Sequence, residues 1–134
     1  MYNIASIGAK PETQLVRLEA IKQAKNAILN CCTPLAIYLF GSAATDFFFE
    51  DSDIDCLVVF ELEQDSARFW KLYSRIRRQT SRPLDLISMS LIEFERKRDL
   101  GGIAFIAWNE GIQIFPESLV ASTNPTSTTA GVPA

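Results

Sequence analysis

The sequence predicts an α/β (α+β) domain: a small mixed β-sheet of three to five strands with helices packed on one face. Short apolar runs at 35–40, 54–60 and 84–89 have the length and composition of strands. Between them, apolar residues recur at three- and four-residue steps, which is typical of helices. The chain of 134 residues is long enough for one domain with its own core, and it contains no internal repeat.

The first predicted helix follows Pro11, a residue that suits the first turn of a helix, and ends before Pro34. Its sequence ETQLVRLEAIKQAKNAILN gives an amphipathic helix of roughly five turns. The residues expected on its inner face are Leu15, Leu18, Ile21, Ala24 or Lys25, and Ile28.

A second helix is predicted over roughly 66–79, with Asp65 or Ser66 as its N-cap. The inner face of this helix carries Phe69, Leu72, Tyr73 and Ile76. The arginines at 75, 77, 78 and 82 are read as a solvated surface rather than a binding patch.

The remaining elements follow from capping and breaking residues. Ser90 and Glu93 form a capping box that opens a third helix. The run 103–109 (IAFIAWN) is a candidate for a further short helix, and 112–115 (IQIF) for a last strand. We expect the folded domain to span 1–116 and the small polar residues of 117–134 to form a disordered tail.

The aromatic residues are read mainly as core. Trp70 and Trp108 are predicted to be core aromatics, and at least one of Phe47, Phe48 and Phe49 is expected to pack inside. A ring of this triplet that stays exposed could stack on a base or form a partner surface.

Composition excludes several functions. The net charge of −3 argues against general nucleic-acid binding. The chain has no histidine, which rules out histidine-based acid–base, triad and zinc chemistry. Three cysteines, Cys31, Cys32 and Cys56, make a poor disulfide framework and indicate a cytoplasmic setting. No apolar run reaches the roughly 18 residues that cross a bilayer.

Polar residues accompany each of the three central strands. Gly41 and Ser42 follow the first strand, Asp53 and Asp55 open the second, and Asp85 lies within the third. Asp53 and Asp55 share a face because side chains alternate along a strand. Neighbouring carboxylates repel each other unless a cation lies between them, so the cluster suggests a divalent-metal and phosphate site at the sheet edge.

Less specific readings exist for the same residues. Asp53 and Asp55 could be a solvated strand entrance. Asp85 could be a core carboxylate paired with Arg82. Ser42 could cap a helix, bind a phosphate oxygen, or do both.

The motif Gly-Ser, ten residues, then Asp-Ile-Asp at 53–55, with a strand aspartate thirty residues further on, resembles the nucleotidyltransferase superfamily typified by DNA polymerase β. It is most similar to the minimal, single-domain prokaryotic branch, and the resemblance covers roughly 12–116. It implies that Gly41 and Ser42 bind the β- and γ-phosphates of a nucleoside triphosphate. It also implies that Asp53, Asp55 and Asp85 hold two Mg²⁺ ions, with Asp85 helping to deprotonate the attacking hydroxyl.

The sequence departs from the family pattern directly after Ser42. Members often carry an arginine and a second glycine there, whereas this chain has Ala43, Ala44, Thr45 and Asp46. An added acid and a missing cation should weaken triphosphate binding.

The resemblance implies transfer of a nucleoside monophosphate, AMP from ATP, to an acceptor hydroxyl with release of pyrophosphate. We see no acceptor-binding domain in the sequence, so the acceptor is expected on a partner or on a second copy of the chain. For the minimal branch, that partner would be a HEPN toxin that the protein adenylylates as its antitoxin. The alternatives are a catalytically weak binding subunit and a small-molecule transferase of the aminoglycoside type.

Overall fold

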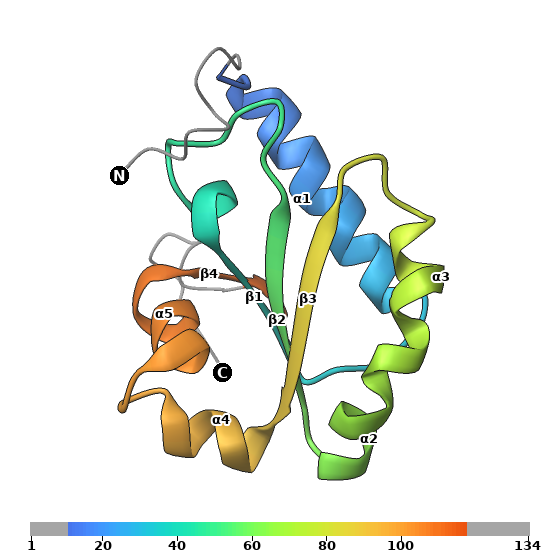
Figure 1. Cartoon of the computed structure of the whole chain (residues 1–134), viewed down its shortest axis with the longest axis vertical. Coiled ribbons are helices and arrows are strands. Elements are labelled where there is room, and N and C mark those ends of the chain that lie inside the picture. Colours follow the sequence, from blue (N-terminus) through green and yellow to red (C-terminus); the bar gives the residue numbers. More distant parts are fainter. Residues whose placement is uncertain (1–10, 118–134) are drawn as a thin grey trace, which may run out of the picture.

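The computed structural model describes residues 11–117 and contains a four-stranded mixed sheet in the order β3-β2-β1-β4 (Figure 1). Its strands are β1 (Ala36–Phe40), β2 (Ile54–Phe60), β3 (Leu84–Ser90) and β4 (Ile112–Phe115). These bounds agree with the predicted strands to within a residue. The mixed sheet expected from the sequence is therefore confirmed.

Strand direction brings the polar residues of different strands to one end of the sheet. β2 and β3 run parallel, with Asp55 opposite Asp85. β1 is antiparallel to both β2 and β4, so its last residue, Phe40, lies opposite Asp55 near the start of β2. The Gly-Ser turn that follows Phe40 therefore lies beside the start of β2.

Helices and 3₁₀ turns connect the strands. They are α1 (Gln14–Leu29), the 3₁₀ turn η2 (Gly41–Ala44), α2 (Glu63–Arg68), the 3₁₀ turn η3 (Phe69–Leu72), α3 (Tyr73–Arg77), α4 (Leu91–Lys97) and α5 (Gly102–Glu110). The parallel pair β2–β3 is joined through α2, η3 and α3, as a parallel connection requires.

Two hydrophobic clusters lie on opposite faces of the sheet. One face of β2 (Ile54, Cys56, Val58) packs against residues of α1 and α3. The alternate residues, Leu57 and Val59, pack with residues of α4 and α5. The expected helical layer is present, and the structure adds a second, smaller layer on the other face, visible as α4 and α5 to the left of the sheet in Figure 1.

The inner face of α1 differs from the predicted one. The helix begins at Gln14, where the Thr13 hydroxyl accepts a hydrogen bond from the amide of Val16. Ala24 and Ile28 are buried, as expected, but Leu15 is 77% exposed and Leu18 is 51% exposed. A three-residue step falls about 60° short of a full turn. Three such steps lead from Leu15 to Ala24, which therefore lies on the opposite side of the helix.

The predicted 66–79 helix is broken into α2, η3 and α3. It starts earlier than expected, with Leu62 rather than Asp65 or Ser66 at the N-cap position. Phe69 and Ile76 are buried on its inner side as predicted. The Ser90 capping box is confirmed, since its hydroxyl accepts the amide hydrogen of Glu93 at 3.2 Å.

The tryptophans were predicted wrongly as core residues. Trp70 and Trp108 are both exposed. The rings of Trp108 and Phe94 pack in a T-shaped, edge-on contact. The guanidinium carbon of Arg98 lies 4.4 Å from the centroid of the Trp108 ring. Such amphipathic rings are commonly half-buried rather than internal.

The phenylalanine triplet divides as expected. Phe48 is 2% exposed and belongs to the core, whereas Phe47 is 62% exposed. All three cysteines are free, and Cys56 is buried within β2. Among residues 11–117, no helix is long and apolar enough to cross a membrane. The predicted tail, except Glu117, lies outside the described residues.

Candidate active site

Asp55 and Asp85 form the centre of the candidate site. They are direct neighbours across the parallel β2–β3 pair, and the negative charge of Asp85 helps to raise the pKa of Asp55. Both lie in line with Leu57 and Met89, on the face that α4 and α5 cover further along the strands. Because α4 begins directly after β3 ends, it lies at the opposite end of this strand from Asp85, as the ribbon of β3 and α4 in Figure 1 shows.

The electrostatics of Asp55 reflect its burial and the two other predicted carboxylates. The pKa of Asp55 is raised from 3.8 to about 6, mainly by burial and then by the negative charges of Asp85 and Asp53. Two ionised carboxylates that lie side by side in a partly buried setting repel each other. The pair therefore favours either a proton or a cation.

Asp53 is held differently from the other two. It precedes β2 and is exposed, so its position depends on the turn before the strand rather than on the sheet. None of the three ion pairs found among residues 11–117 involves Asp53, Asp55 or Asp85. The sequence-based alternative of an Asp85–Arg82 pair is thus wrong, because Arg82 pairs with Glu12 at 3.0 Å.

Gly41 packs directly against the Asp55 carboxylate. Its φ of +75° is a left-handed conformation that side chains disfavour. A Cβ atom at this position would lie 3.1 Å from Cγ of Asp55 and closer still to one carboxylate oxygen. Only glycine lets the turn after β1 approach Asp55 this closely.

The turn after Gly41 is a single 3₁₀ turn, η2. The Ser42 carbonyl accepts hydrogen bonds from the amide and hydroxyl of Thr45, at 3.0 and 2.8 Å. The Ser42 hydroxyl makes no hydrogen bond with any residue of the 11–117 segment, so it does not act as a helix cap there. Thr45 also accepts the amide hydrogen of Phe47 at 3.0 Å, which gives this departure from the family pattern a structural role.

Arg17 supports the same turn from α1. Its Nε donates to the Ala43 carbonyl at 2.8 Å, and Ala43 is fully buried. Sequence reasoning did not single out Arg17, because the contact joins residues 26 positions apart and depends on how α1 lies over η2.

The donor set suits magnesium. Carboxylate oxygens are the ligands that Mg²⁺ prefers, and it usually takes one or two of them together with water and phosphate. Within residues 11–117, no group of three acidic, cysteine or histidine side chains is placed so that it could hold a metal ion, so the structure does not group Asp53, Asp55 and Asp85 as three ligands. The Asp55–Asp85 pair still provides the two carboxylates that a phosphate-bridged Mg²⁺ requires, so the residues fit the ion.

The comparisons with known proteins agree with this fold. Residues 20–115, well over half of the chain, match the family model described as polymerase beta, nucleotidyltransferase. The protein therefore belongs to the polymerase β-type nucleotidyltransferase family.

A crystal structure of a protein from Sulfolobus solfataricus, provisionally described as a nucleotidyltransferase, is similar to this chain with a TM-score of 0.49 and 21% identity. The match covers 84% of this chain and 87% of the other. The comparison with curated proteins gives no match.

Proposed function

We propose that this protein transfers a nucleoside monophosphate, AMP from ATP, to a hydroxyl group of a partner protein. The observation that carries the proposal is the Asp55–Asp85 pair, in register and with Asp55 pressed against Gly41, in a chain of the polymerase β-type family. Such a pair is costly to keep ionised without a cation, and a nucleoside triphosphate arrives with one.

Each residue has a defined part in the reaction. The Gly41 amide and the Ser42 hydroxyl would bind the β- and γ-phosphates. Asp53, Asp55 and Asp85 would hold two Mg²⁺ ions, which, when bound, neutralise charge on the leaving pyrophosphate and lower the pKa of the attacking hydroxyl.

The chemistry balances as a single displacement. The acceptor oxygen forms a bond to the α-phosphorus, and the bond between that phosphorus and the oxygen leading to the β-phosphate breaks. The proton of the acceptor hydroxyl passes to the Asp85 carboxylate, and pyrophosphate leaves. Asp85 suits this role because its side chain is exposed and accessible to an acceptor, whereas Asp55 is partly buried beside it.

The acceptor is proposed to lie on a HEPN toxin, with this chain acting as its antitoxin and as a member of the minimal nucleotidyltransferase branch. This part of the proposal rests on the sequence resemblance. The exposed ring of Phe47, on the loop that follows η2, gives such a partner an apolar contact close to the site.

Transfer of label from ATP tests the proposal. The full chain is incubated with [α-³²P]ATP and Mg²⁺, with and without the protein encoded by the adjacent gene. We expect the partner to become labelled and pyrophosphate to be released. Asp53→Ala and Asp85→Asn should abolish labelling, while Asp99→Asn, at an exposed aspartate outside the cluster, should not. Unchanged labelling by Asp53→Ala would refute the metal-site assignment.

A catalytically weak binding subunit is the second candidate. The observation that favours it is the acidic, exposed Asp46 beside the proposed phosphate site, where family members often place a cation. In the same experiment this candidate predicts a stable complex with the partner but no label transfer. Transfer to an aminoglycoside in place of a protein would identify the small-molecule alternative.

A further inference from the structure

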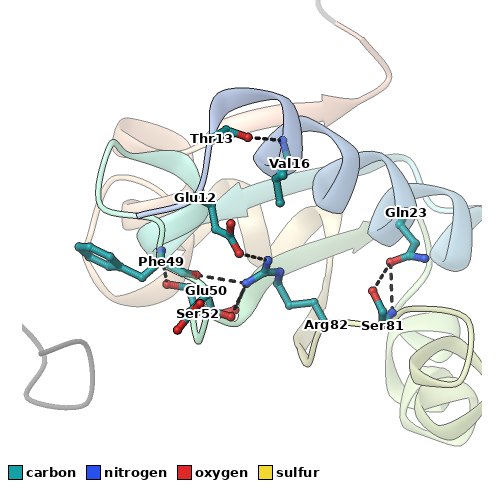
Figure 2. Close-up of polar contacts among 9 residues, drawn as sticks. All are labelled: Glu12, Thr13, Val16, Gln23, Phe49, Glu50, Ser52, Ser81 and Arg82. Carbon is teal, nitrogen blue, oxygen red and sulfur yellow. Dashed lines mark hydrogen bonds and ion pairs between the residues drawn. The ribbon is translucent and has the colours of Figure 1, made fainter. Parts of the chain in front are cut away.

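Arg82 contacts both Glu12 and the segment 49–52, which directly precedes Asp53 (Figure 2). Its Nη1 donates to three backbone carbonyls, those of Phe49, Glu50 and Ser52, at 3.1, 3.0 and 3.2 Å. Its Nη2 pairs with Glu12 at 3.0 Å. The side chain is only 14% exposed, so these contacts form in a largely dehydrated setting, where they are strong.

The carbonyls belong to one tight turn, 49–52, that leads to Asp53. The Ser52 amide donates to the Phe49 carbonyl, and the Phe49 amide donates to the Ser52 hydroxyl, both at 3.0 Å. The guanidinium also lies 4.5 Å from the centroid of the Phe48 ring, which is buried in the core. Arg82 thus holds this turn in place through its carbonyl contacts and links it to the core through Phe48.

Arg82 is also close to Asp85 along the chain. It lies three residues before Asp85, and the carbonyl of the next residue, Pro83, accepts the amide hydrogen of Ile54 at 3.0 Å. The segment before β3 is tied to α1 as well, because Gln23 accepts hydrogen bonds from the amide and hydroxyl of Ser81 at 3.1 and 3.3 Å.

The contacts explain why an arginine is needed. Its planar head offers several donors in fixed directions, while a lysine ammonium is a compact point charge. Arg82 forms its ion pair with Glu12, and no ion pair within residues 11–117 involves Asp55 or Asp85. The Asp55–Asp85 pair can then attract a metal ion instead.

We propose that Arg82 is a positioning residue that fixes Asp53 relative to Asp55 and Asp85. Asp53 depends on such support because it lies outside β2 and is exposed. The inference rests on the proposed function in one respect: the geometry that Arg82 maintains is that of a metal-binding site.

Manganese binding by the full chain tests the proposal without requiring activity. Titration calorimetry with Mn²⁺ is carried out at a temperature where every variant is folded by circular dichroism. Arg82→Lys keeps the charge but loses most carbonyl contacts, and we expect it to weaken Mn²⁺ binding 10- to 100-fold, as for other residues that support metal ligands.

Two variants separate positioning from general stability. Glu12→Gln leaves the three carbonyl contacts in place, so we expect a lower melting temperature with Mn²⁺ affinity within about twofold of wild type. Arg78→Lys is the matched control, since Arg78 is exposed and its side chain bonds to Ser74 alone among the described residues. Wild-type affinity in Arg82→Lys, or an equal loss in Glu12→Gln, would overturn the proposal.

If the wild-type chain binds no Mn²⁺, that result would count against the proposed function. The positioning role of Arg82 is then tested by a second measurement. In that case amide hydrogen exchange at 50–54 is compared between Arg82→Lys and Arg78→Lys. Exchange at least tenfold faster in Arg82→Lys alone supports positioning by Arg82. Equal exchange in the two variants refutes it.

Discussion

Asp55 and Asp85 are register partners in neighbouring parallel strands, and the negative charge of Asp85 contributes to the raised pKa of Asp55. Packing alone gives no reason to place two acids side by side where β2 and β3 begin. The arrangement stores unfavourable electrostatic energy that a proton or a divalent cation relieves. The pH and metal dependence of stability should therefore report on this pair.

The first prediction concerns pH. The pKa of Asp55 is raised from 3.8 to about 6 on folding, so the folded state holds this proton more tightly than the unfolded state. Stability from this group is fully present below pH 4 and is lost as the pH rises through about 6. Asp55→Asn should raise the free energy of unfolding at pH 8 by about 1–2 kcal/mol, after allowance for solvent screening.

Urea denaturation of metal-free protein at pH 4 and pH 8 measures this effect. The urea midpoint of Asp55→Asn should be nearly the same as that of wild type at pH 4 and several tenths molar higher at pH 8. Asp99→Asn controls for removal of one surface carboxylate. A difference that is the same at both pH values would show that Asp55 does not carry the electrostatic cost.

The second prediction concerns Mg²⁺. An ion that binds only the folded state stabilises it by about 2.7 kcal/mol at one hundred times its Kd. Mg²⁺ should therefore raise the melting temperature of wild type at pH 8. Asp55→Asn and Asp85→Asn should lose this shift, because each leaves one carboxylate of the pair.

Ionic strength is matched with NaCl in the Mg²⁺ experiment, since surface ion pairs also respond to salt. The effect in wild type should shrink at pH 5, where protons compete for Asp55. An equal Mg²⁺ shift in Asp85→Asn would place the ion elsewhere on the protein.

The third prediction separates two adjacent phenylalanines. Phe48 is buried and Phe47 is exposed. Phe48→Ala should cost about 3–5 kcal/mol through cavity formation and loss of the ring beneath Arg82, whereas Phe47→Ala should stay within about 0.5 kcal/mol. Chemical denaturation measures both. A large cost for Phe47→Ala would show that its ring is covered in the native protein.

Much of the fold could be predicted from sequence because the strands are short apolar runs with clear breaks. The alternation in β3 placed Asp85 on one face and Leu86 on the other, and the structure agrees. The parallel register that puts Asp85 beside Asp55 was not available from spacing, since it depends on the length and path of α2, η3 and α3.

Two features of the sequence were misleading for identifiable reasons. Steps of three residues in α1 drift around the helix, so Leu15 and Leu18 joined a stripe to which they do not belong. Arg82 was read as part of a solvated surface or as a partner of Asp85. Its true partners are carbonyls of a distant turn, and backbone groups of an unpredicted turn give no sequence signal.

The fourth prediction uses two glycines with nearly equal backbone angles. Gly41 has φ of +75° and lies against Asp55, while Gly102 has φ of +76° and open space around its missing Cβ. Gly102→Ala should cost about 1–2 kcal/mol from backbone strain alone. Gly41→Ala adds overlap with the carboxylate, for a total of about 2–4 kcal/mol, and should also remove the Mg²⁺ shift in melting temperature. Equal costs in the two variants, with the Mg²⁺ shift kept in Gly41→Ala, would mean that the turn after β1 does not shape the carboxylate site.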